Sequence, residues 1–340
     1  MRSTVRRFVS VLGAVALLST AACTNEEPGP QASGRPTVPG PPTTRLLYAL
    51  SQVTATEENK RHVEFTDLAA LRRVSNGRPF DRRFGLLAVG AGELAGFAER
   101  IAQPTGIDLS QATDALVTGS TSGDAGRING PFDAKTIGAK LTGLGYTPVP
   151  GVPNAWAGAS EDGLDADDPL VKLGVTASHG LNVVRVDSGE GITYARQRDA
   201  LRRIPAERGS GSLADEPAHR AVAGCLGTAI AAVLLVDEPQ PHPPNLVGVG
   251  VTSGASAGDL RQIMCVQVDG DAAAAVRTLQ RTLREGSSRT GTAWQRLLPE
   301  ATVEQAGDGM IRLTATPAAS AGPGLLIRAL IVNDLPRWRG

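Results

Sequence analysis

The N-terminal segment of this chain has the form of an export signal. Three arginines precede an apolar run at residues 8–18, and small residues then lead to Cys23. Eleven apolar residues are too few to cross a bilayer as a helix, because a spanning helix needs about 20. A positive start, a short apolar run and small residues before a cleavage point are typical of a secretory signal peptide. We therefore predict that residues 1–22 are a signal peptide outside the fold.

The cysteine that follows this segment resembles the lipobox cysteine of bacterial lipoproteins. There the thiol is acylated, for instance with palmitate, and the cysteine becomes the new N-terminus. Lipoboxes usually have leucine three residues before the cysteine, and Thr20 stands there in this chain; cleavage that leaves a free Cys23 is the alternative. Residues 24–44 favour lipidation, since this proline-rich stretch suits an extended spacer. We predict that residues 23–44 form a lipid anchor and stalk at the extracytoplasmic face of the cell membrane.

The charge balance excludes one class of partner. The 34 basic residues equal the 34 acidic residues, so the chain lacks the basic footprint of a nucleic-acid-binding protein. Aromatic residues are only 4%, which argues against platforms that stack bases. Removal of the signal peptide leaves a slightly acidic polypeptide with no overall polybasic attraction to a membrane. We expect membrane contact through the lipid anchor and no nucleic acid.

Two further cysteines remain for the folded part. In an oxidising compartment, Cys225 and Cys265 are expected to form a disulfide. A closed loop of 40 residues implies about 4 kcal/mol of stabilisation in the chain-entropy model. A redox or metal pair is the alternative, but the chain has no C-x-x-C motif and no histidine beside either cysteine.

The body of the chain is expected to be α+β. Residues 45–205 and 206–340 both follow the order strand, helix, hairpin, which predicts two pseudo-repeated halves. We expect each half to be an antiparallel sheet with helices packed on one face. The first half is expected to include a strand and a capped helix at 62–74, a helix at 131–145, a hairpin at 170–187 and a helix at 192–204. The second is expected to include strands at 228–237, 245–254 and 262–270, a helix at 271–285 and a hairpin at 301–317.

Glycine-rich motifs give weak chemical signals. Residues 254–258 fit the G-x-S-x-G elbow of α/β-hydrolases around Ser256, but the last histidine, His242, lies upstream and a strand-like segment follows. We interpret this motif as a turn. Glycines at 90, 92 and 96 resemble the glycine-rich loop of dinucleotide-binding proteins, but their spacing does not match that motif. The glycines of the VGVGV run at 247–251 are typical of a strand with a close neighbour.

Metal ligands are also sparse. An acidic loop is the best Ca²⁺ candidate, but it lacks the spacing and the distal Glu of an EF-hand, and we interpret it as solvated; its acids are Asp162, Asp165, Asp167 and Asp168. The four histidines are far apart, with no pair at i, i+4, and are expected at surfaces or turns; they are His62, His179, His219 and His242. We predict no metal and no cofactor.

Several segments resemble a group of actinobacterial lipoproteins of unknown function. The resemblance rests on the export signal, Cys23, the stalk, the late cysteine pair and three body motifs. These motifs are VEFTDLAALRRV (63–74), GIDLSQATDAL (106–116) and INGPFDAKTIGAKLTGLGY (128–146). The resemblance implies a location at the envelope and no particular activity.

The expected function is that of a non-catalytic, membrane-anchored binding or scaffold protein. Its partner would be an envelope protein, a polymer or a small ligand. Two alternatives stay open. The first is a secreted serine hydrolase that uses Ser256, and the second is a carrier that holds a small ligand in a cleft between the halves.

Overall fold

The computed structural model describes residues 44–119, 125–158, 168–175, 178–205, 210–237, 245–253, 259–307 and 309–339. The signal peptide, Cys23 and the stalk up to residue 43 lie outside these ranges. Residues 41–340 form one compact unit. Both hydrophobic cores are built from residues between Leu46 and Trp338, so this unit carries its own core.

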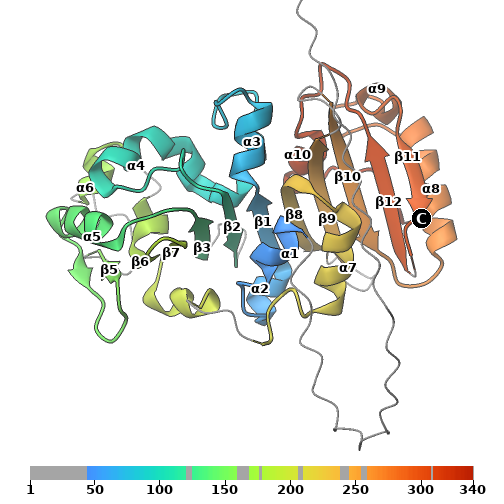
Figure 1. Cartoon of the computed structure of the whole chain (residues 1–340). Coiled ribbons are helices and arrows are strands. Elements are labelled where there is room, and N and C mark those ends of the chain that lie inside the picture. The colour runs from blue at the N-terminus through green and yellow to red at the C-terminus, as the bar shows by residue number, and fades with distance from the viewer. Residues whose placement is uncertain are drawn as a thin grey trace, which may run out of the picture. The chain divides into compact units, whose positions relative to one another are not determined.

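Antiparallel strands dominate the unit. They form one 12-stranded sheet within the described residues, in the order β11-β12-β10-β9-β8-β1-β2-β3-β7-β6-β5-β4 (Figure 1). The strands are β1 (His62–Thr66), β2 (Asp114–Thr118), β3 (Ala125–Asn129), β4 (Thr147–Pro148), β5 (Ala155–Ala157), β6 (Val183–Asp187), β7 (Gly191–Ala195), β8 (Ala229–Asp237), β9 (Asn245–Ser253), β10 (Leu260–Gln267), β11 (Thr302–Gln305) and β12 (Met310–Ala315).

The α+β class is confirmed, but the expectation of a separate sheet in each half is wrong. Strand β1 pairs with β2 on one side and with β8 on the other, with Phe65 opposite Ala232. An unpaired edge on a strand as apolar as β8 would leave buried backbone groups without partners. The β1–β8 pairing removes both edges and joins the strands into one sheet.

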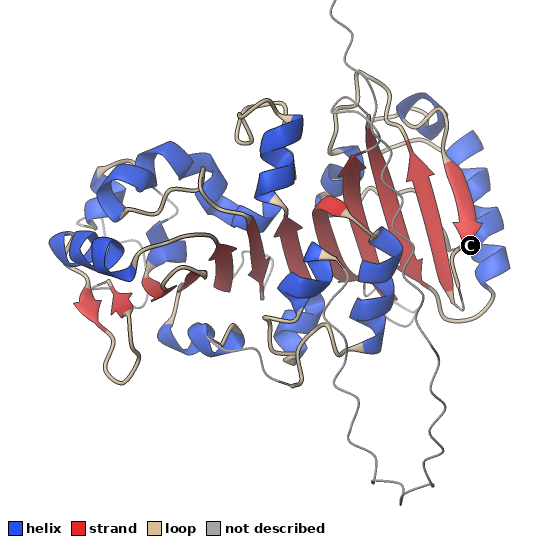
Figure 2. Ribbon diagram, in the orientation of Figure 1, coloured by secondary structure: helices blue, strands red, loops and turns tan. Residues whose placement is uncertain are grey.

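Helices cover both faces of this sheet, whereas one face had been expected (Figure 2). The α-helices are α1 (Arg45–Leu50), α2 (Glu57–Arg61), α3 (Leu68–Val74), α4 (Ala98–Thr105), α5 (Ala134–Gly143), α6 (Pro169–Lys172), α7 (Pro217–Leu226), α8 (Ala272–Glu285), α9 (Trp294–Leu297) and α10 (Leu325–Ile331). The 3₁₀ helices are η1 (Gly85–Leu87), η2 (Val89–Phe97), η3 (Ser178–Leu181) and η4 (Arg198–Arg203). Helices α1, α7 and η4 share one core, while α3, η2, α4, α5, α8 and α10 share the other.

Two cores are needed because side chains alternate along each strand. In β9, the valines at 247, 249 and 251 enter the core shared with α10, and the glycines between them face α7. A Cβ atom on Gly248 would lie 2.4 Å from Cγ1 of Val222. The glycine therefore lets α7 pack directly on the strand, as the sequence had indicated.

Two elements of the first half differ from expectation. The hairpin expected at 170–187 contains α6, η3 and the single strand β6. The helix expected at 192–204 begins as β7 and ends as η4. In β7, Ile192 and Tyr194 enter one core and Ala195 the other, so the segment is buried on both faces of the sheet.

The predicted disulfide is confirmed. Cys225 of α7 is bonded to Cys265 of β10, with the two Cα atoms 6.2 Å apart. Cys265 is fully buried at the interface between the sheet and α7. The bond therefore fastens this helix to the sheet.

Candidate functional site

A concave polar site lies against strands β2 and β3, on the face of the sheet that α1 covers. It is a cavity of about 580 Å³. Its lining residues are Arg45, Tyr48, Gln52, Thr113, Asp114, Arg127, Asn129, Gly189, Glu190 and Pro205. We call it the polar pocket. All of these residues fall within 45–205, so the pocket lies inside the predicted first half and not between the two halves.

Helix α1 forms one wall of the pocket. The Thr44 hydroxyl accepts a hydrogen bond from Leu47 N at 3.2 Å and caps the helix, as threonine commonly does at this position. Leu46 and Leu50 enter the core. The residues that line the pocket, at 45, 48 and 52, are three and four positions apart and so project from the same side of the chain.

The floor of the pocket is set by strand register. Arg127 of β3 lies opposite Thr193 of β7, which in turn lies opposite Arg185 of β6. One pair further along, Asn129 lies between Asp114 of β2 and a glycine of β7. Because side chains two residues apart share a face of a strand, these polar groups all meet on one side of the sheet.

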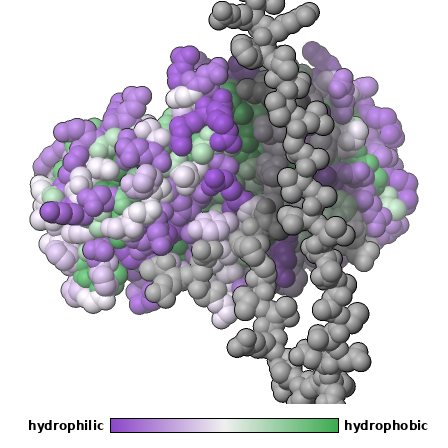
Figure 3. All heavy atoms as spheres, viewed as in Figure 1, coloured by the Kyte–Doolittle hydropathy of each residue, from purple (hydrophilic) through white to green (hydrophobic). Residues whose placement is uncertain are grey.

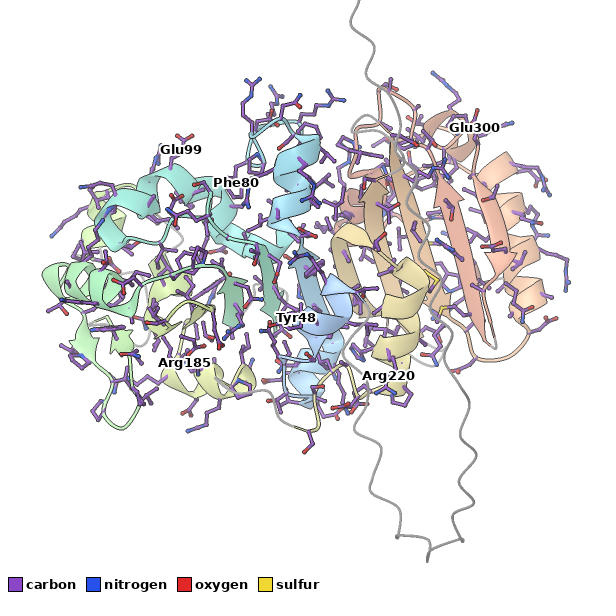
Figure 4. All side chains as sticks on the ribbon, viewed as in Figure 1. Tyr48, Phe80, Glu99, Arg185, Arg220 and Glu300 are labelled. Atoms are coloured by element: carbon purple, nitrogen blue, oxygen red, sulfur yellow. A yellow bond between two sulfur atoms is a disulfide. The ribbon has the colours of Figure 1, made fainter. Side chains whose placement is uncertain are left out.

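Two buried arginines share one carboxylate. Arg127 Nη1 donates to Asp187 Oδ2 at 2.7 Å, and Arg185 Nε donates to Asp187 Oδ1 at 3.2 Å. Both guanidinium groups also donate to the Thr193 hydroxyl, at 3.3 and 3.0 Å. The exposed fraction of the residue is 3% for Arg127 and 8% for Arg185, so their charges are held away from bulk water. Figure 4 places Arg185 and Tyr48 on the lower side of the sheet in that view.

An amide links these arginines to a second carboxylate. Asn129 Nδ2 donates to Asp114 Oδ1 at 2.6 Å and to Gln52 Oε1 at 3.0 Å. Asn129 Oδ1 accepts from Arg127 Nε at 2.8 Å. Arg45 completes the network, since its Nη1 lies 3.3 Å from Asp114 Oδ2 and its Nε lies 3.2 Å from Asp67 Oδ2.

A glycine makes room for this amide. A Cβ atom on Gly191 of β7 would lie 3.1 Å from Asn129 Oδ1 and 2.6 Å from the Ile128 carbonyl oxygen. The glycine also leaves no side chain between Asn129 and Asp187, which both pair with it across β3 and β6. The network therefore depends on this position as well as on the polar residues.

Burial governs the electrostatics of the pocket floor. Desolvation raises the pKa of Asp114 above its ordinary value of 3.8, although the Asn129 hydrogen bond and the positive charge of Arg45 oppose the rise. Taking charges out of water costs energy that pairing often only offsets. A network of this kind is therefore a poor source of stability, and satisfied polar networks serve better to hold a defined arrangement of donors and acceptors.

The arrangement is suited to hydrogen bonding more than to proton transfer. Both Asp114 oxygens already accept hydrogen bonds, one from Asn129 and one from Arg45 and Thr113. The described residues that line the pocket include no histidine, cysteine or lysine. Pockets with a few fixed polar groups are typical of small-molecule binding.

The histidines expected at surfaces or turns include two that are buried. His62 of β1 lies with Nε2 3.2 Å from Glu64 Oε1, and His219 of α7 lies with Nε2 3.1 Å from the Lys60 carbonyl oxygen. Burial lowers the pKa of His219. Neither histidine lines the pocket.

The glycine run at 90–96 has a packing role. A Cβ atom on Gly90 would lie 2.2 Å from the Ala115 carbonyl oxygen and 2.4 Å from the Thr66 backbone nitrogen. This glycine lets η2 lie directly on β1 and β2. The segment forms 3₁₀ turns on the sheet and not the strand-to-helix turn of a dinucleotide site.

Most of the other candidates from the sequence lie outside the described residues. They are Ser256, His242 and three of the four acids of the acidic loop. The fourth, Asp168, caps α6 by accepting from Leu170 N at 2.7 Å. In the part of the chain that is described, no three His, Cys, Asp or Glu side chains are placed to hold a metal ion. The described helices are also too short or too polar to cross a bilayer.

Sequence reasoning missed the residues of the pocket. They come from distant segments, and only the register of β2, β3, β7 and β6 brings them together. One signal was present: the segments around Arg127 and Arg185 are otherwise strand-like and apolar. An arginine inside a strand that is buried on both faces needs a fixed partner.

Comparisons with family models, with curated proteins and with solved structures give no match to this chain.

Proposed function

We propose that this protein is a lipid-anchored, non-catalytic binding protein at the extracytoplasmic face of the cell membrane, and that the polar pocket holds its ligand. The anchor rests on the signal-like residues 1–22, on Cys23 and on the proline-rich stalk. The resemblance to actinobacterial lipoproteins supports the same location. The observation that carries the binding role is the buried network of Arg127, Asp187 and Arg185 beneath an open cavity.

The proposed ligand is a small neutral molecule rich in hydroxyl or amide groups. Arg127 and Arg185 each already contact the Asp187 carboxylate, and Asp114 contacts Arg45, so an ion of either sign would meet groups that already have an ion-pair partner. A neutral polar ligand can use the remaining donors and acceptors without breaking these pairs. Tyr48 adds an aromatic side chain to the pocket lining, which suits contact with the apolar parts of such a ligand.

Native mass spectrometry tests this proposal. The protein is purified gently from its own cells, and we expect a retained mass that is absent from a Tyr48→Ala/Glu190→Lys variant. Both residues line the pocket, and the Glu190 side chain is 73% exposed, so the double variant is expected to fold.

The matched control is Lys135→Glu, in a shallow hollow formed by α5 and Trp156. We expect this variant to keep the adduct. An adduct that is equally abundant in the pocket variant, or no adduct in the wild-type protein, would contradict the proposal.

The hydrolase alternative is separated by a fluorophosphonate probe. If the chain is a non-catalytic binding protein, the probe does not label it. If it is a serine hydrolase that uses Ser256, the probe labels the wild-type chain and the Ser256→Ala variant loses the label.

A further inference from the structure

A concentrated positive charge lies at the outer end of α3, on the face of the sheet opposite α1. We call the segment from residue 73 to residue 86 the arginine loop. It contains only one acidic residue, Asp81. Four of its side chains are exposed and form no ion pair within the described residues: Arg73, Arg78, Arg82 and Arg83. The segment therefore carries a net positive charge, although the charges of the whole chain balance.

The loop backbone is held in place by hydrogen bonds and burial. The Asp81 carboxylate accepts from the backbone N–H groups of Arg83 at 2.9 Å and Phe84 at 3.0 Å. Gly77 N donates to the Arg72 carbonyl oxygen at 2.8 Å. Phe84 is buried in the core beneath, and Arg83 lies 5.2 Å from the centroid of its ring. The arginines are therefore presented from an ordered backbone.

The loop projects outward, which limits what it can bind. Figure 1 shows α3 standing away from the sheet with the loop at its far end, and Figure 3 shows a strongly hydrophilic projection there. A projecting surface cannot enclose a small ligand, but it can contact an extended surface. Leu86, 36% exposed, ends the loop beside the first turn of α10, where a Cβ atom on Gly324 would lie 2.9 Å from its Cδ2.

We propose that the arginine loop docks the unit formed by residues 41–340 on anionic phospholipid headgroups. Guanidinium groups bind phosphate through paired hydrogen bonds, and each basic side chain near an anionic membrane adds attraction. An exposed leucine beside them suits the boundary between headgroups and acyl chains.

The tether named in the proposed function brings this loop within reach of lipid. Residues 24–44 could span at most about 75 Å if fully extended. Helix α1, which follows the tether in the chain, lies on the other face of the sheet, so docking requires the unit to turn its α3 face to the membrane.

Vesicle sedimentation tests the proposal. Residues 41–340, which carry both cores and lack Cys23, are mixed with phosphatidylcholine vesicles with or without phosphatidylglycerol. We expect binding only to the anionic vesicles, and weaker binding as salt is raised. An attraction of about 1 kcal/mol per arginine corresponds to about fivefold in partitioning, so Arg82→Ser/Arg83→Ser is expected to weaken binding about 25-fold.

The matched control removes the same charge elsewhere. Arg281→Ser/Arg284→Ser changes two exposed arginines of α8 and is expected to leave binding within about twofold of the wild-type value. Equal loss in both double variants would show a general charge effect and overturn the docking site. Binding to neutral vesicles alone, or to neither kind, would also overturn it. Because this unit lacks the anchor and the test does not use the pocket, the result is separate from the proposed function.

Discussion

The shared carboxylate of Asp187 gives the sharpest test of the pocket floor. Asp187→Asn removes the negative charge that lies 2.7 Å from Arg127 Nη1 and 3.2 Å from Arg185 Nε. The side chains of these arginines are only 3% and 9% exposed, so bulk water would solvate their charges poorly once the carboxylate is gone. Breaking a buried ion pair from one side typically costs 3–5 kcal/mol. We expect the free energy of unfolding to fall by about 3–5 kcal/mol.

Urea unfolding of the unit formed by residues 41–340, with the disulfide intact, measures this change. The control is Asp199→Asn, whose carboxylate pairs with Arg202 at the surface, where the two side chains are 80% and 78% exposed. We expect no measurable change there. A loss below about 1 kcal/mol for Asp187→Asn would refute the view that this carboxylate balances two buried charges.

Three further predictions concern charge, packing and the disulfide. Burial raises the folded-state pKa of Asp114, so the folded state holds this proton more tightly and loses stability as pH rises from 3.8 through the raised pKa. Asp114→Asn does not titrate there, so its free energy of unfolding is expected to rise relative to that of the wild type over this pH range. A difference in unfolding free energy that does not change with pH would contradict this prediction. Gly126→Ala places a Cβ atom 2.3 Å from the buried Tyr194 ring and is expected to lower the free energy of unfolding in denaturant by about 1–3 kcal/mol. The control, Gly224→Ala in α7, has open space around it and is expected to raise the free energy of unfolding by as much as about 1 kcal/mol. Equal effects of the two variants would show that Gly126 is not needed for the close contact with Tyr194. Replacing both disulfide cysteines by alanine is expected to cost about 2–4 kcal/mol, and an unchanged unfolding midpoint would refute the stabilising role of that bond.

Local patterns in the sequence were enough to predict the strands and helix α8 of the second half, whereas helices α7, α9 and α10 were not predicted. The apolar runs of β8 and β9, the amphipathic α8 and the alternation in β12 each identify one element without reference to the rest of the chain. The first-half strand and helix around Asp67 were predicted for the same reason, because its side chain accepts from Ala70 N at 2.8 Å and caps α3.

The pairing of distant strands could not be predicted in this way. The β1–β8 contact joins residues more than 160 positions apart, and no local pattern distinguishes one 12-stranded sheet from two smaller ones. β7 was missed because its residues are buried by neighbours on both faces, so tertiary packing outweighs local propensity. The pocket depends on the register of β2, β3, β7 and β6, and its residues became visible only with that register.

The disulfide was predictable because only two cysteines remain once Cys23 is assigned to lipid. The position of that bond between α7 and β10 was not, since neither segment carries a signal for the other. The proposed attachment of the chain to the membrane still rests on the residues before α1.

Metabolic labelling with an alkynyl fatty acid tests that attachment most directly. Cells that make the full chain incorporate the label, and the purified protein is compared with a Cys23→Ala variant. We predict strong labelling of the wild-type chain, recovered with the membranes, and none of the variant. Equal labelling of both proteins, or a wild-type chain that carries no label, would contradict a lipid anchor at Cys23.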